Sequence, residues 1–195
     1  MKTWLSLSRA IDRINHWVGK ISLWLILATT LISAGNAIVR KAFNYSSNAY
    51  LEIQWYLFAT VFLLASGYVF MHNAHVRIDS LSSKFSAKTR NWIDLIGISV
   101  VLLPFCVLMF ALSWPLFVQA YVSGELSSNA GGLIRWPAYM LMPAGFALLG
   151  LQGVSELIKR IAYLRGHGPD VLAHHTHEEL DSLVPSSERG GQSHD

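Results

Sequence analysis

The histidines are the residues of this chain whose types and spacing most directly suggest chemistry. His72 and His75 lie three positions apart, and His174, His175 and His177 lie close together near the C-terminus. Neutral imidazoles at such spacings bind metal ions, and a facing pair can hold a haem. A haem between membrane helices needs histidines on two facing helices, but only one apolar stretch of this chain contains any. The sequence therefore predicts neither a resident metal nor a cofactor, and the C-terminal histidines are interpreted as incidental.

Other reactive groups are too few or too scattered for an active site. The single cysteine, Cys106, excludes an intrachain disulfide and a cysteine redox pair. No phosphate-binding loop, catalytic carboxylate pair or nucleophile motif occurs. The main amides within apolar stretches are neutral and lie near the ends of those stretches: Asn36, Gln54, Gln119 and Gln152. Because a coupling-ion site calls for an ionisable residue deep in a span, we predict that the chain is not an enzyme and carries no charged solute alone.

The elements that hold these residues are four long stretches without Asp, Glu, Lys or Arg. They are Ile21–Val39, Ile53–Val76, Leu95–Gly124 and Trp136–Ser155. A helix rises about 1.5 Å per residue, so roughly 20 residues cross the ~30 Å hydrocarbon core of a bilayer. The sequence predicts an all-α membrane protein with four transmembrane helices in one domain, 1–166. We place the spans at about 21–39, 53–73, 95–118 and 136–155.

The distribution of positive charge predicts the orientation. Residues 1–20, 77–94 and the region after 155 each contain four Lys or Arg, whereas the opposite side contains three. Because segments rich in Lys and Arg remain in the cytoplasm, we expect both termini inside and the loops 40–52 and 125–135 outside. The net charge of +3 is explained by this placement, so no nucleic-acid partner is predicted.

The segment before the first span has a helical pattern of its own. Trp4, Leu7, Ile11, Ile14 and Val18 recur at three- and four-residue steps, with basic residues between them. This pattern predicts an amphipathic helix that lies in the cytoplasmic interface and contacts membrane lipid. The alternative is a plain extension of the first span. Cleavage of that span as a secretory signal is disfavoured, because its apolar run is longer than the usual 7–15 residues.

The third stretch allows two readings, because Pro104 and Pro115 each remove a backbone donor and favour a kink. It is either one long kinked helix or a span that ends near Trp114 and is followed by an interfacial segment. Rising polarity towards its end favours the first reading. In the fourth stretch, Gly150 and Gly153 predict close helix packing. The acidic region 167–195 is poor in large apolar residues and is predicted to be a disordered cytoplasmic tail.

The order of two short segments in this sequence resembles the order found in a known family. Glu52 opens the second apolar stretch in the segment 52–58 (EIQWYLF), and the segment 75–79 (HVRID) closes it. Together with Gly131, Gly132 and the region around Trp136, this order is similar to the small permease subunit of tripartite ATP-independent periplasmic (TRAP) transporters, the DctQ-like subunits. The likeness covers about residues 5–165. Ile78 stands where valine is commoner in the family, a conservative difference.

The resemblance implies the partners and the role of the chain. In such systems a periplasmic solute-binding protein delivers an organic acid, and a large permease subunit moves it inward across the bacterial inner membrane, driven by a sodium gradient. The small subunit associates with the large one and enlarges its static scaffold. The resemblance therefore implies no substrate-binding residues in this chain.

The candidates for a partner interface or a structural role are Glu52, Trp55, His75, Arg77, Asp79, Gly150 and Gly153. The charged residues among them either contact the large subunit, fix the turn after the second span, or are satisfied by water, headgroups or one another. Pairing of Glu52 with Arg40 or Lys41 is one example of the last case.

Two functions from other classes remain open on the sequence alone. One is a haem-binding or plain membrane anchor subunit of a respiratory oxidoreductase, which in its haem form would show a Soret band. The other is a self-contained small transporter or a structural protein with four spans. The scarcity of intramembrane histidine and of charged residues within the spans argues against both.

Overall fold

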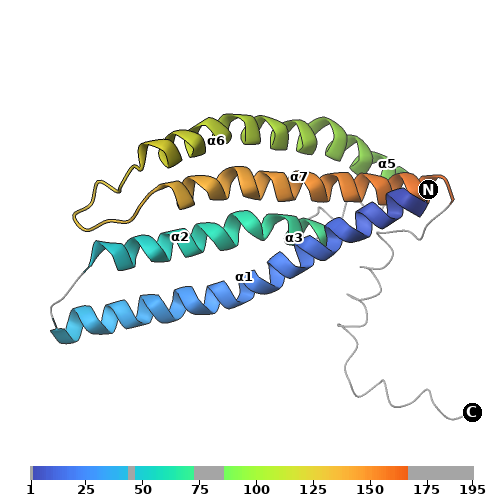
Figure 1. Cartoon of the computed structure of the whole chain (residues 1–195). Helices are drawn as coiled ribbons and strands as arrows, with labels where there is room; N and C mark the ends of the chain where they lie inside the picture. The colour runs from blue at the N-terminus through green and yellow to red at the C-terminus, as the bar shows by residue number, and fades with distance from the viewer. Residues whose placement is uncertain (1, 44–46, 73–85, 167–195) are drawn as a thin grey trace, which may run out of the picture.

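The structure, a computed structural model, describes residues 2–43, 47–72 and 86–166. Its elements are α1 (Lys2–Phe43), α2 (Asn48–Leu64), α3 (Ser66–Met71), α5 (Ala87–Gly97), the π-helical segment η1 (Ile98–Leu102), α6 (Leu103–Ser123) and α7 (Trp136–Leu164) (Figure 1). Within these ranges the backbone is helical apart from turns, loops and an isolated antiparallel bridge between Leu126 and Ile134.

Within the described ranges, four helical stretches are long and apolar enough to cross a membrane. They are Thr3–Phe43, Asn48–Met71, Lys88–Ser123 and Trp136–Leu164. The predicted all-helical fold with four spans is thereby confirmed. The orientation and the interfacial position of the N-terminal segment stay predictions, and the predicted tail lies outside the described residues.

The helices lie side by side with α7 in a central position. It packs against α6 on one side and against α2, α3 and the beginning of α1 on the other, as Figure 1 shows. We call the end of the molecule where α1 begins and α7 ends the terminal end. The opposite end, where the loop 124–135 joins α6 to α7, is called the loop end.

The first helix, α1, runs without a break from Lys2 to Phe43 and packs through small and polar residues. Its buried positions recur at three- and four-residue steps and are Ser8, Ile11, Asn15, Gly19 and Ser22. The large apolar side chains of Trp4, Leu7 and Ile14 are instead largely exposed. This arrangement suits a membrane protein, because small residues let helices approach closely and large apolar residues can face lipid.

The second span consists of α2 and α3, which meet at Ala65. Two glycines make it possible for neighbouring helices to approach there. A Cβ added to Gly67 of α3 would lie 2.2 Å from Oδ1 of Asn15, and one added to Gly145 of α7 would lie 2.8 Å from the carbonyl oxygen of Leu63. A larger residue at Gly145 would therefore push α2 and α7 apart, whereas one at Gly67 would displace the side chain of Asn15.

The third span is one continuous helical path from Ala87 to Ser123, in which η1 joins α5 to α6. In η1 the N–H of Leu103 donates to the carbonyl of Ile98, five residues earlier. Pro104 follows directly and has no N–H to donate, so a local π turn accommodates the missing bond. The helix then continues through Pro115 and ends before Gly124, whose positive φ of 61° suits glycine. The structure thus has the long helix and not a span that ends near Trp114.

Candidate functional site

In the part of the chain that the structure describes, polar side chains gather in two clusters, one at each end of the helices. The loop-end cluster is centred on Glu52, which is 4% exposed in the first turns of α2. Its Oε2 accepts a hydrogen bond from the main-chain N–H of Leu133 at 2.7 Å, and its Oε1 accepts one from Nδ2 of Asn129 at 2.8 Å. The hydroxyl of Ser127 also donates to Oε1. One carboxylate therefore holds three points of the loop between α6 and α7.

These contacts correct one possibility raised by the sequence. The hydrogen bonds of Glu52 go to the loop between α6 and α7, and not to Arg40 or Lys41 at the end of α1. Gly132 lies directly beside this carboxylate. A Cβ at that position would lie 2.5 Å from Cβ of Ser127 and 2.9 Å from Oε1 of Glu52. The loop therefore needs glycine there in order to close around the carboxylate.

Further bonds fix the same loop to α2. Nδ2 of Asn48 donates to the carbonyl of Ala130 at 3.1 Å, and the hydroxyl of Tyr56 donates to the carbonyl of Ile134 at 3.3 Å. At the base of the loop, Arg135 forms an ion pair with Glu125. The hydrogen bond from Arg135 to that carboxylate raises the pKa of the guanidinium group. The loop end is thus a closed, hydrogen-bonded cap on α2.

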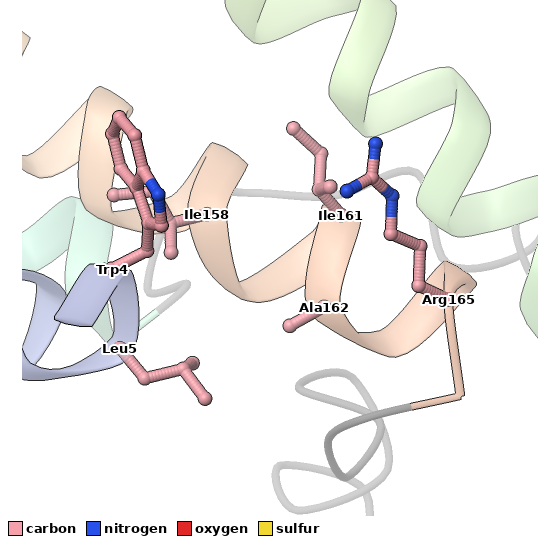
Figure 2. Close-up of a pocket in the computed structure, with 6 residues that line it drawn as sticks. All are labelled: Trp4, Leu5, Ile158, Ile161, Ala162 and Arg165. Atoms are coloured by element: carbon pink, nitrogen blue, oxygen red, sulfur yellow. The ribbon is translucent and has the colours of Figure 1, made fainter. Parts of the chain in front are cut away.

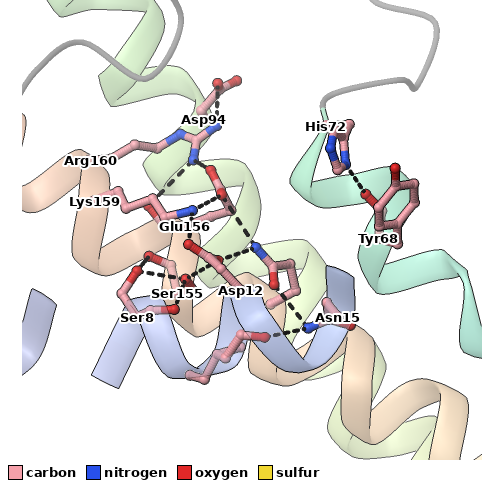
Figure 3. Close-up of polar contacts among 12 residues, drawn as sticks. Ser8, Asp12, Asn15, Tyr68, His72, Asp94, Ser155, Glu156, Lys159 and Arg160 are labelled. Atoms are coloured by element: carbon pink, nitrogen blue, oxygen red, sulfur yellow. Dashed lines mark hydrogen bonds and ion pairs between the residues drawn. The ribbon is translucent and has the colours of Figure 1, made fainter. Parts of the chain in front are cut away.

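The terminal-end cluster joins the first and last helices (Figure 3). Its hydrogen-bonded members are Ser8, Asp12 and Asn15 of α1 and Gln152 and Ser155 of α7. Nδ2 of Asn15 donates to Oε1 of Gln152 at 2.9 Å. Nε2 of Gln152 in turn donates to Oδ1 of Asp12 at 2.9 Å. The hydroxyls of Ser8 and Ser155 lie 2.7 Å apart and share one hydrogen bond.

Ion pairs extend this cluster towards the end of α7 and bring in α5. Nζ of Lys159 lies 2.8 Å from Oδ2 of Asp12 and 2.9 Å from Oε1 of Glu156. Arg160 pairs with Glu156, and its Nη2 lies 3.1 Å from Oδ2 of Asp94. The side chains of Glu156 and Arg160 are each only 1% exposed. Buried charges are costly unless they are paired, so these contacts are needed for the three helices to pack.

An apolar cleft of about 350 Å³ lies beyond this cluster, between the start of α1 and the end of α7 (Figure 2). It is lined by Trp4, Leu5, Ile158, Ile161, Ala162 and Arg165. A small-molecule site needs several polar groups that converge on the ligand, whereas this lining is apolar apart from Arg165. The cleft therefore does not have the character of a substrate site.

Residues 29–162 match the family model described as the DctQ component of tripartite ATP-independent periplasmic transporters. The chain belongs to this family. Family membership makes it a TRAP transporter small permease subunit, a multi-pass membrane protein and a transport component. The matched segment contains Glu52 and the α7 half of the terminal-end cluster, but it begins after Ser8, Asp12 and Asn15. No curated protein and no solved structure matches the chain significantly.

The structure places the other residues that the sequence singled out. Gly150 and Gly153 face α6 and η1, where added Cβ atoms would lie 3.4 Å from Cβ of Cys106 and 3.1 Å from Cδ2 of Leu102. Trp55 is exposed on α2. The remaining candidates, His75, Arg77 and Asp79, and the C-terminal histidines lie outside the described residues.

Sequence reasoning missed the terminal-end cluster of this DctQ family member. The signal was present in the spacing, because Ser8, Asp12 and Asn15 share one face of a helix and so do Gln152, Ser155 and Glu156. What the spacing does not show is that the two polar faces meet.

A second unpredicted contact joins His16 to the second span. The ring centroids of Tyr68 and His72 lie 4.2 Å apart, and that of His16 lies 5.9 Å from Tyr68. No group of His, Cys, Asp or Glu that could hold a metal ion occurs among residues 2–43, 47–72 and 86–166.

Proposed function

We propose that this chain supports the large permease subunit of a TRAP transporter in the bacterial inner membrane, during sodium-driven uptake of organic acids delivered by a periplasmic binding protein. The match to the DctQ family over residues 29–162 carries this proposal. It covers most of the four membrane-length helices. In such a complex the substrate path and the coupling ions belong to the large permease, and this chain adds membrane-embedded surface.

The partners of the buried carboxylates in the structure favour a non-catalytic, structural role for this chain. The carboxylates of Glu52 and Glu156 are bonded within the chain, so neither is held ready for a solute. The outward surface is apolar instead. On α2, exposed Trp55, Phe58 and Phe62 follow at three- and four-residue steps and form one aromatic stripe. A stripe of this kind suits contact with lipid or with an apolar helix of the large permease.

The proposed orientation has the terminal end in the cytoplasm and the loop end in the periplasm, following the distribution of Lys and Arg. The closed loop held by Glu52 would then face the solute-binding protein. Cysteine labelling tests this orientation in a Cys106→Ala background. An impermeant maleimide added to spheroplasts should label Ala130→Cys in the loop and should not label Ser6→Cys near the start of α1. Labelling of Ser6→Cys without labelling of Ala130→Cys would show that the orientation is the opposite of the proposed one.

The transport role is tested by co-purification and reconstitution. The tagged chain, extracted in a mild detergent, should bring down a much larger permease with many spans. Uptake of an organic acid into vesicles under a sodium gradient should need both membrane subunits and the binding protein. Full-rate uptake by the large permease and the binding protein alone would contradict the proposed role.

A further inference from the structure

Exposed cations form one stripe on the part of α1 nearest the terminal end. Arg9, Arg13 and Lys20 are all exposed. They are separated by four and then seven residues, which places them along one side of the helix. This side is different from the buried face of α1, since that face contains Asn15 and Ser22. The stripe is therefore available to something outside the bundle.

The acidic residues of the same end do not neutralise this stripe. Among the described residues, those acids are Asp12, Asp94 and Glu156, and each is paired with Lys159 or Arg160 of α7. The negative charges of these three carboxylates are compensated within the terminal-end cluster. The stripe thus presents positive charge outward, and we call it the basic stripe: Arg9, Arg13 and Lys20.

An exposed tryptophan lies beside the basic stripe on the same helix. Trp17, between Arg13 and Lys20, is 63% exposed. Tryptophan side chains prefer the headgroup level of a bilayer, where the ring is partly apolar and its N–H finds a polar partner. The combination of outward cations and an outward tryptophan on a helix is typical of a surface that contacts lipid headgroups.

The position of Arg13 relative to the charge-free stretch of α7 also places the basic stripe near the headgroups of the bilayer. Asp12 bonds Ser155 at 2.8 Å, so the two residues lie at the same height in the bundle. Ser155 ends the charge-free stretch of α7. Arg13, one residue beyond Asp12, therefore lies near the boundary between hydrocarbon and headgroups. Lys20 directly precedes the charge-free stretch Ile21–Val39 of α1, and its long side chain can extend towards the headgroups.

We propose that the basic stripe binds the headgroups of anionic phospholipids. Zwitterionic headgroups carry no net charge, so they gain much less from three outward cations. Each Lys or Arg near an anionic surface contributes about 1 kcal/mol, which corresponds to about fivefold in affinity. The inference does not depend on the transport role, because the binding surface belongs to this chain alone.

Native mass spectrometry of the full chain tests the proposal. The protein is purified in a mild non-ionic detergent, stripped of lipid and mixed with phosphatidylglycerol or phosphatidylcholine. The wild type should retain phosphatidylglycerol in preference. The triple variant Arg9→Gln, Arg13→Gln, Lys20→Gln should bind it about fivefold more weakly for each cation removed. The matched control, Arg40→Gln with Lys41→Gln, neutralises exposed cations at the other end of the same helix and should bind as the wild type does.

Two results would overturn the proposal: equal retention of the two lipids by the wild type, or the same loss in the control as in the triple variant. A second measurement does not depend on how the variants fold. A photo-crosslinking benzoylphenylalanine at Trp17, irradiated in membranes of cells that express the whole transporter, should add the mass of one phospholipid. A crosslink to a protein would instead make this surface a subunit interface and would contradict the lipid site.

Discussion

The hydroxyl of Ser155 on α7 donates a hydrogen bond of 2.8 Å to the carboxylate of Asp12 on α1, across 143 positions of sequence. With the bonds around it, this contact holds the first helix to the last by polar groups and not by large apolar side chains. In a membrane the association of helices gains little from apolar contact, because lipid is equally apolar, and interhelical hydrogen bonds contribute about 0.6–2 kcal/mol each. The terminal-end cluster therefore fixes the relative position of α1 and α7.

The ion pairs in this cluster predict a strong effect of removing Arg160. In Arg160→Met the buried carboxylate of Glu156 keeps only Lys159 as a cationic partner, and Asp94 loses its contact with Arg160. We expect a loss of up to about 3–5 kcal/mol in the free energy of unfolding, because the remaining cation is partly exposed and compensates a buried charge less well than Arg160 does. Thermal unfolding of the purified chain in detergent measures this loss.

Two controls separate the buried pair from a general loss of charge. Lys159→Met removes a cation whose side chain is 21% exposed, so water can partly replace it and the loss should be smaller. The double variant Glu156→Leu with Arg160→Met removes both buried charges and should recover most of the stability. Equal stability of Arg160→Met and the wild type would show that the pair is not buried in the folded protein.

The bond between Asn15 and Gln152 predicts a measurable coupling between α1 and α7. Asn15→Ala leaves Oε1 of Gln152 without this donor, so a loss of about 1–3 kcal/mol is expected. In a double-mutant cycle with Gln152→Ala, the two losses should not add, since the residues contact each other. Asn36→Ala, on the same helix but far from the cluster, is the control. Additive losses at 15 and 152 would contradict the direct contact.

The loop end predicts a local change when Glu52 is altered. Glu52→Gln replaces an acceptor of three hydrogen bonds with a side chain that has only one acceptor oxygen. The loop 124–135 should open more often and be cut faster by an added protease. Glu125→Gln, which alters only the more exposed pair with Arg135, should have a smaller effect. Equal cleavage rates for the two variants would show that Glu52 does not hold the loop.

The four spans could be predicted from the sequence because each rests on one local property, the absence of charge over about 20 residues. The sequence also favours a continuous helix through Pro115, because polarity rises near Gln119. Other features were not predictable in this way. The pairing of Glu52 with Leu133 joins residues 81 positions apart through a main-chain N–H that no side-chain pattern marks.

The terminal-end cluster shows a second reason why the packing of the helices could not be predicted from the sequence. The sequence predicts that an amphipathic helix with the apolar residues Trp4, Leu7, Ile11, Ile14 and Val18 determines the position of the N-terminal segment. In the structure a neighbouring face of α1 packs inside, which is mainly small and polar and shares only Ile11 with the apolar face, with Asn15 against Gln152. Because lipid is as apolar as the interior, an apolar face does not indicate which side of a membrane helix packs inside, and only the fold shows which partner the polar face meets.

The close approach of α2 and α7 predicts opposite effects for two glycines. Gly145 of α7 would place an added Cβ 2.8 Å from the carbonyl oxygen of Leu63 and 2.9 Å from its Cβ, so Gly145→Ala must separate the helices. A loss of about 1–3 kcal/mol is expected, as for other overpacked interiors. Gly35 of α1 has no atom within 4 Å of that position, so Gly35→Ala should be neutral or gain up to about 1 kcal/mol from helix propensity. Thermal unfolding of the purified chain compares the two, and an equal loss in both would contradict the packing of α7 against α2.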